Sequence, residues 1–294
     1  MKFGVREICD VVIRAKSTQT IGNQTFQKDE PVIYFDTAKT SSVEGAANTV
    51  YAQGGKGNSR LIAWEGERTV TFTMEDALIS PLGFAILSGA GLVEASANKK
   101  VNVHMSNNIE VVVGADPSNL EVDLTEYIPT NGALSSVDPY GFILNASGSI
   151  GVRLDKGTVN SSAKTISFDA SGVTELQTGD KVVVLVDYYV EMSSGVTQLE
   201  VTPDKFAGSY YLEASTLFRR QEDGVDMPAQ FIIPNVKIQS AFNFSMAASG
   251  DPSTFTFTMD AFPDYTKFDK TKKVLFALQI VEDFSGAAAK YSIG

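Results

Sequence analysis

The chain has 294 residues, of which 43% are hydrophobic, and it carries a formal net charge of −11 at pH 7. No apolar run approaches the ~18 residues of a membrane span, and the acidic balance argues against a protein that grips nucleic-acid phosphates with clustered lysine and arginine. The single cysteine, Cys9, excludes an intramolecular disulfide, and the single histidine, His104, excludes a two-histidine metal site and would have to serve any histidine-dependent catalytic constellation.

The first 94 residues predict four strands followed by one short helix. Apolar and polar residues alternate over residues 8–15, 31–36, 60–65 and 68–74, which is the pattern of half-buried strands. Residues 65–67 predict a polar turn between the last two strands. The helix is expected to begin after Ser80, with Pro81 in its first turn, and to end at Gly89.

A long loop is expected between the second and third of these strands. It comprises the 23 residues from Thr37 to Ser59, which are rich in glycine, alanine, serine and asparagine. Structureless loops longer than about 12 to 15 residues are usually functional or disordered. Two interpretations of this loop stay open. It is either disordered, or it becomes ordered against another subunit. In the second case the predicted ring-stacking or subunit contacts are Val50, Tyr51, Gly54, Gly55, Lys56 and Gly57.

The middle of the chain predicts a separate domain. Residues 95–205 contain short strands separated by turn sequences such as Asp116-Pro117 and Asp138-Pro139, a pattern typical of an Ig-like β-sandwich. This segment holds 14 acidic and 7 basic residues, so its net charge is −7. We therefore expect one discontinuous domain, residues 1–94 with 206–294, and one inserted domain, residues 95–205, on the outer surface of any assembly.

One strand motif occurs in both halves of the outer domain. Thr71-Phe72-Thr73-Met74 and Thr256-Phe257-Thr258-Met259 are each followed by an acidic residue. Alternation places the phenylalanine and methionine on a buried face and the threonines on the other face. Each copy is preceded by another alternating stretch, residues 61–64 or 238–246, which predicts two related hairpins. Further strands are expected at residues 206–217, 230–246, 254–259 and 273–282.

Two polar clusters invite a functional interpretation. Glu222, Asp223 and Asp226 follow two arginines and could form a carboxylate pair for hydrolysis, but we favour a polar hairpin tip that makes contacts. The second cluster is either a solvated turn or a dock for an acidic partner, and it comprises Lys267, Lys270, Lys272 and Lys273. No catalytic residue, metal site or cofactor is expected.

Two stretches of the sequence resemble the tail tube proteins of large contractile-tailed bacteriophages. The first runs from Arg60-Leu61-Ile62-Ala63-Trp64-Glu65-Gly66 through Thr69–Leu78 to Ser80-Pro81, and the second is Met227-Pro228-Ala229-Gln230-Phe231-Ile232-Ile233-Pro234-Asn235-Val236-Lys237-Ile238. The resemblance covers residues 1–94 and 206–285. It implies an all-β tube domain of packed sheets with one short flanking helix, similar to the Hcp proteins of type VI secretion.

The resemblance also implies a function. In that family six subunits form a ring, one sheet from each joins a continuous barrel around a lumen, and rings stack through the loop after the second strand. The implied protein is a structural component of the virion, made in the host cell cytoplasm and without enzymatic activity or membrane anchoring. Its implied partners are itself, the tail sheath, the baseplate and the tail terminator, with DNA passing through unbound. A monomeric Ig-like surface binding module and a carboxylate-pair hydrolase are the alternatives.

Overall fold

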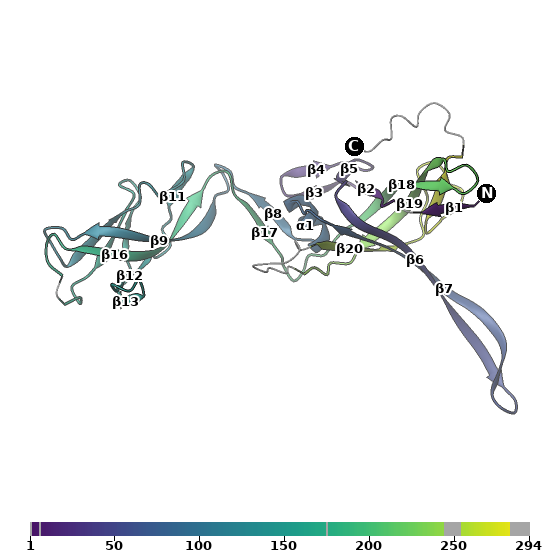
Figure 1. Ribbon diagram of the computed structural model, residues 1–294, viewed down its shortest axis with the longest axis horizontal. Helices are drawn as coiled ribbons and strands as arrows, with labels where there is room; N and C mark the ends of the chain where they lie inside the picture. Colours follow the sequence, from purple (N-terminus) through teal and green to yellow (C-terminus); the bar gives the residue numbers. More distant parts are fainter. Residues whose placement is uncertain (1, 6, 175, 244–253, 283–294) are drawn as a thin grey trace. The chain divides into compact units, whose positions relative to one another are not determined.

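The computed structural model describes residues 2–5, 7–174, 176–243 and 254–282 of the chain (Figure 1). Apart from a single α-helix and the turns and connections, these residues form β-strands, so the all-β prediction is confirmed. The chain divides into two compact units. Unit 1 comprises Met1–Leu92 with Leu199–Gly294, and unit 2 comprises Val93–Gln198.

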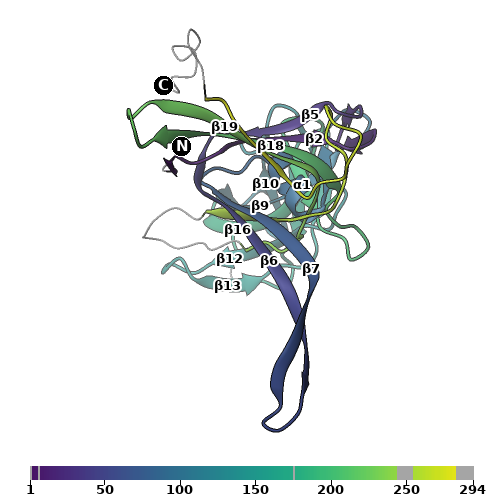
Figure 2. The same cartoon turned by 90° about the vertical axis from the view of Figure 1, so that its right-hand side faces the viewer.

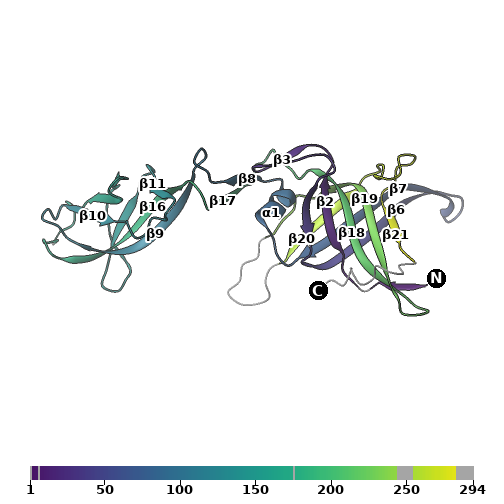
Figure 3. The same cartoon turned by 90° about the horizontal axis from the view of Figure 1, so that it is seen from above.

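Unit 1 is built on one nine-stranded antiparallel sheet (Figure 3). Its main path runs in the order β5-β2-β18-β19-β20-β7-β6, while β1 pairs with β18 and β21 pairs with β19. The strands are β1 (Phe3–Val5), β2 (Asp10–Ala15), β5 (Pro31–Phe35), β6 (Ala38–Gly54), β7 (Ser59–Asp76), β18 (Ser209–Arg220), β19 (Asp226–Ile238), β20 (Phe255–Ala261) and β21 (Ala277–Ile280). A small hairpin of β3 (Gln19–Ile21) and β4 (Gln24–Phe26) stands apart from this sheet.

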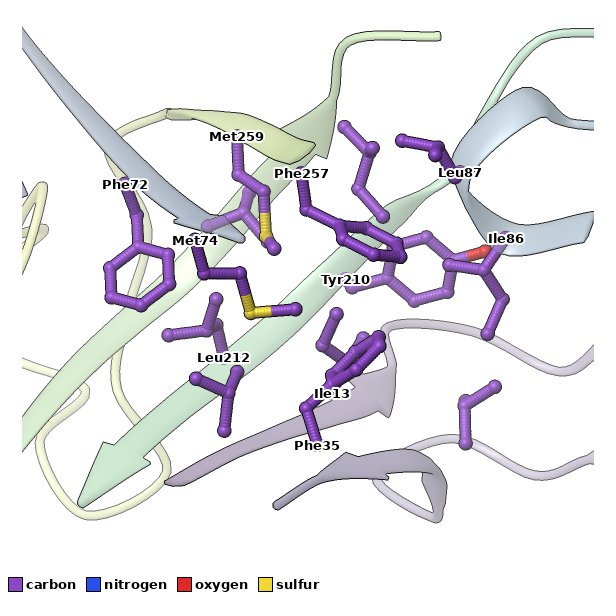
Figure 4. Packing of buried hydrophobic residues seen from close by; sticks show 14 of the residues in the cluster. Ile13, Phe35, Phe72, Met74, Ile86, Leu87, Tyr210, Leu212, Phe257 and Met259 are labelled. Carbon is purple, nitrogen blue, oxygen red and sulfur yellow. The ribbon is translucent and has the colours of Figure 1, made fainter. Parts of the chain in front are cut away.

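The sheet curls around the main hydrophobic core of unit 1. Phe35 on β5 and Phe257 on β20 meet edge to face with their ring centroids 4.9 Å apart. Three strands separate β5 from β20 along the sheet, and in a flat sheet with ~4.8 Å between strands the two positions would lie about 19 Å apart. The contact therefore requires strong curvature. Figure 4 shows the enclosed side chains, which include Ile13, Phe72, Met74, Ile86, Leu87, Tyr210, Leu212, Phe257 and Met259.

The two copies of the repeated motif lie side by side. Strands β7 and β20 pair so that Phe72 is opposite Met259, Thr73 opposite Thr258, and Met74 opposite Phe257. The phenylalanines and methionines are fully buried, as the alternation predicted. The first predicted hairpin is wrong, because residues 61–64 and 70–74 belong to the one strand β7. In the second, β19 pairs antiparallel with β20, with Ile238 opposite Met259, but β19 ends at Ile238, and residues 244–253 lie outside the described part of the chain.

Helix α1 (Pro81–Ser88) has the ends that the sequence predicted. The Ser80 hydroxyl accepts a hydrogen bond from the Gly83 amide at 3.0 Å, and Pro81 occupies the first turn. Gly89 ends the helix at φ 69°, and a β-carbon there would lie 2.3 Å from the carbonyl carbon of Phe206. Only glycine satisfies both the left-handed backbone and this close approach.

The expected loop between Thr37 and Ser59 is instead part of a long β-ribbon, so that prediction is wrong. Strands β6 and β7 pair antiparallel from Ala38 opposite Asp76 to Gly54 opposite Ser59, and only residues 55–58 form the turn. We call residues 45–69 the arm, which extends away from the rest of unit 1 (Figure 2). Strand β6 was not predicted, because its small and polar residues show little apolar alternation, whereas residues 60–65 and 68–74 of β7 were expected as strands.

Unit 2 is a sandwich of two antiparallel sheets around its own core. One sheet contains β10 (Asn119–Asp123), β15 (Thr165–Asp169) and β14 (Thr158–Asn160). The other contains β9 (Val101–Val112), β16 (Lys181–Met192), β11 (Gly132–Leu134), β12 (Tyr140–Leu144) and β13 (Ile150–Arg153). The shared core includes Leu120 and Phe168 from the first sheet and Val186 and Tyr188 from the second. Ig-like connectivity stays a prediction.

The boundary between the units falls within a two-stranded ribbon. Strands β8 (Gly91–Glu94) and β17 (Thr197–Glu200) pair with each other, and the Ala95 amide donates to the Val196 carbonyl at 2.8 Å. The chain therefore enters and leaves unit 2 through neighbouring strands, as an inserted segment requires. The strands of unit 2 are not all short as expected, because residues 101–112 form the single strand β9.

Burial of Tyr210 predicts a loss of stability at alkaline pH. Desolvation in the unit 1 core raises the pKa of this phenol from 10.0 to about 12. Since the phenol of the unfolded chain ionises first, the free energy of unfolding should fall between pH 10 and pH 12, by up to about 1.4 kcal/mol per pH unit. Tyr210→Phe should remove this part of the fall, and exposed Tyr51→Phe should not. Urea unfolding at pH 9 to 11 measures this fall in the free energy of unfolding. An equal dependence of that free energy on pH in the wild type and in both variants would contradict the prediction.

Candidate assembly surfaces

The arm has no hydrophobic core of its own. None of residues 45–69 is buried, and the side chains of Val50 and Trp64 are 56% and 53% exposed. Tyr51, Leu61 and Ile62 are exposed as well. A two-stranded hairpin is at best marginally stable in water, and contiguous exposed apolar side chains mark interaction sites. The arm is therefore a surface that lacks a partner within the described part of the chain.

The two faces of the arm differ in chemistry. Residues directly opposite in an antiparallel pair share a face, and Val50 is opposite Trp64 while Ala52 is opposite Ile62. We call these four residues the tryptophan face. The other face carries Tyr51, and the Arg60 guanidinium lies 4.1 Å from the centre of its ring.

The stacking residues predicted from the sequence all lie in the arm. Val50, Tyr51 and Gly54 are on β6, and Gly55, Lys56 and Gly57 form the turn. Their role in ring stacking stays a prediction. Sequence reasoning missed Ile62 and Trp64, which it assigned to a half-buried strand. The signal was present: Leu61-Ile62-Ala63-Trp64 is apolar on both faces, so the alternation expected over residues 60–65 does not hold.

The predicted acidic hairpin tip is held by arginine side chains. Glu222 and Asp223 lie in the turn between β18 and β19, and Asp226 begins β19. Arg219 donates two hydrogen bonds to Asp226, at 2.6 and 2.8 Å, and Arg220 pairs with Asp223 at 3.1 Å. The hydrogen bond from Arg219 lowers the pKa of the Asp226 carboxyl. A general acid needs a raised pKa, so Asp226 is not suited to that role. The contact role of the tip stays a prediction.

A row of aromatic rings lies at the same end of the β18–β19 hairpin. Phe3 stacks on Phe218 with centroids 4.9 Å apart, Phe218 contacts Phe231 edge to face at 6.3 Å, and Phe231 approaches Phe276 at 6.4 Å. Strands β1 and β21 flank the hairpin and leave apolar side chains exposed. We call the following exposed residues the aromatic end: Phe3, Val5, Val225, Phe276, Leu278 and Val281.

The four lysines of the predicted basic dock lie on the connection between β20 and β21. Lys267 lies 4.6 Å from the ring centre of Tyr211, and desolvation lowers the pKa of its ammonium. Lys273 lies 5.6 Å from the ring centre of Tyr265, and the side chains of Lys270 and Lys272 are exposed. The structure thus places all four on one segment, and their docking role stays a prediction.

A polar face covers the outside of β6, β7 and β20. On β7, Thr71 lies between Glu44 and Asp260 on the neighbouring strands, and Thr73 lies between Ser42 and Thr258. The Thr71 hydroxyl donates to Asp260 at 3.2 Å. We call these six residues the threonine face, and it lies opposite the buried Phe72 and Met74.

Neither a metal site nor a membrane span emerges from the described residues. They contain no group of three or more histidine, cysteine, aspartate or glutamate side chains placed to hold a metal ion. None of their helices combines the length and apolar character needed to cross a membrane.

The fold is that of an all-β protein with a curled sheet. Two of its surfaces, the arm and the aromatic end, are suited to self-association. A family model described as the YomU/Tube protein family matches residues 4–275, nearly the whole chain, and the chain belongs to this family. Membership confirms the expectation from the sequence that this is a tail tube protein, which is a structural component of a phage virion. No curated protein matches the chain.

Proposed function

We propose that this protein is the subunit of the inner tail tube of a contractile-tailed phage. Six subunits form a ring, rings stack into a tube, and the genome passes through the lumen into the host when the sheath contracts. The observation that carries this proposal is the arm, a ribbon of 25 residues with no buried side chain. Such a ribbon is stabilised by contacts with other subunits.

Closure of subunits into a ring would cover the unpaired edge strands of the unit 1 sheet. The main path of the sheet ends at β5 on one side and at β6 on the other. Unpaired edges expose backbone donors and acceptors and promote uncontrolled association. A head-to-tail contact between different surfaces that closes by rotation gives a ring, and one that advances along an axis gives a filament. A tube of stacked rings uses both kinds of contact.

The threonine face fits the wall of a lumen. Glu44 and Asp260 add negative charge to its hydroxyl groups. Tight binding of DNA requires clustered lysine and arginine, and a polar, mildly acidic wall lacks that attraction. Such a wall supports passage of the genome without specific binding.

The remaining partners are assigned by charge and size. Unit 2 is a folded segment of more than 100 residues, which would obstruct a channel, so we place it on the outer surface of the tube. Residues 95–205 carry a net charge of −7, which keeps tubes soluble and provides a surface for the sheath protein. The baseplate and the tail terminator would cap the two ends of the tube, and the basic cluster from Lys267 to Lys273 would dock an acidic partner surface.

Removing unit 2 is expected to leave unit 1 folded. The change deletes residues 96–195 and joins Ala95 to Val196, which already share a hydrogen bond, through an Asn-Gly turn. Because unit 1 has its own core, its thermal transition should persist, and rings should still form. Calorimetry and negative-stain electron microscopy of the shortened protein test both expectations. Loss of the cooperative unit 1 transition would contradict the insertion model.

Electron microscopy of the full chain tests the proposed function. Purified protein imaged across a concentration series should form rings or tubes with a central hole, and the rings should have six-fold symmetry. Analytical ultracentrifugation of the same samples should detect assembly that increases with concentration. Uniform monomers at every concentration would overturn the proposal and favour a monomeric surface binding module.

A further inference from the structure

We propose that the tryptophan face of the arm of one subunit packs against the aromatic end of a second copy of this chain, with the basic tip of the arm beside Glu222. The inference rests on the proposed function, because it names the surface that receives the arm in the tube. It joins two apolar surfaces and one charge pair that the described residues of unit 1 leave uncovered.

The arm does not reach the aromatic end of its own subunit. Figure 2 shows the arm and the β18–β19 hairpin extending from the sheet in different directions. The four residues of the tryptophan face and the six of the aromatic end therefore need partners from elsewhere. A second copy supplies both at once, because each copy carries one of each surface.

The two surfaces match in chemistry. The tryptophan face presents Val50, Ile62 and Trp64, and the aromatic end presents Phe3 and Leu278, all of them exposed. Neither set has a charged member, so their contact removes apolar area from water without burying an unpaired ion. Since the surfaces differ, the contact is head-to-tail and can repeat from copy to copy, as a tube requires.

Charge favours this end of unit 1 over the exposed apolar region around Phe268. Residues 45–64 contain Lys56 and Arg60 and no acidic residue, so this part of the arm is basic. At the hairpin tip, Asp223 and Asp226 are paired with arginines, and Glu222 has no ion pair among the described residues. The exposed Phe268 lies among the lysines at 267–273, which would repel the basic tip.

Thiol cross-linking between two kinds of subunit tests the contact. In a Cys9→Ser background, which leaves no other cysteine, Lys56→Cys subunits are mixed with Glu222→Cys subunits and treated with a short bis-maleimide. We expect covalent dimers in the mixture and no more than background in either protein alone. The matched control pairs Lys56→Cys with Lys270→Cys, which is also exposed, and should give background cross-linking.

Charge reversal provides a second, independent readout. Lys56→Glu with Arg60→Glu should raise the protein concentration needed for half-maximal assembly at least tenfold, and adding Glu222→Lys should restore most of the loss. Tubes that cross-link through Lys270→Cys instead of Glu222→Cys, or that gain nothing from Glu222→Lys, would overturn this contact and leave the tail tube function standing. Monomeric wild-type protein at every concentration would overturn the function and this contact together.

Discussion

Phe257→Ala is expected to lower the free energy of unfolding of unit 1 by roughly 3 to 5 kcal/mol. The Phe257 ring is fully buried, and it meets Phe35 across the interior of the curled sheet (Figure 4). Truncation removes its apolar contacts and leaves a cavity between strands that the sheet pairing holds in place. Thr258→Ala, on the opposite face of the same strand, is the matched control and should change the free energy by less than about 1 kcal/mol.

A double-mutant cycle tests the curvature of the sheet directly. If Phe35 and Phe257 touch as described, the effects of Phe35→Ala and Phe257→Ala should be non-additive by about 0.5 to 1.5 kcal/mol. Urea unfolding of the two single variants and the double variant measures this coupling. Additive effects would indicate that β5 and β20 do not meet across the core.

Local sequence patterns predicted those elements that have one buried face. Strands β2, β5, β18 and β20 and helix α1 were expected close to where they lie. In each strand, burial of one face imposes alternation, and in the helix Ser80 and Gly89 mark the ends. The buried Phe72 and Met74 followed from the same rule. The order of the strands in the sheet did not follow from local patterns, because β20 pairs with β7 across about 180 residues of sequence.

The β6 half of the arm was not predicted, because neither face of the arm is buried. Without burial there is no alternation, and residues 37–59 therefore had the composition of a loop. Glu65-Gly66-Glu67 resembled a turn, yet the strand continues through it with a shift of register near Gly66. A bulge of this kind accommodates an extra residue without ending the strand.

The candidate contacts could be predicted only in part. Lys56 and its neighbours were placed in a segment that contacts other subunits, and they lie at the tip of the arm. Trp64 was assigned to a half-buried strand, and its position opposite Val50 follows only from the pairing of β6 with β7. The surface that receives the arm has no local signal, since Phe3 and Leu278 come together only through pairing with β18 and β19.

Shortening the arm should separate folding from assembly. The change replaces residues 47–68 by an Asn-Gly turn between Ala46 and Thr69, which are already opposite each other. No buried side chain is removed, so the free energy of unfolding should stay within about 0.5 kcal/mol of the wild-type value. Stacked tubes should be absent at every concentration, because the removed segment includes the whole tryptophan face.

Two measurements on the same protein decide this prediction. Calorimetry reports whether unit 1 still unfolds in one cooperative transition, and negative-stain electron microscopy reports whether rings stack. The variant without unit 2 is the matched control, because it loses many more residues and should still assemble. A shortened-arm protein that stacks as the wild type does would show that the arm is not the link between rings. One that fails to fold would show instead that the exposed ribbon stabilises its own subunit, contrary to the absence of buried residues in it.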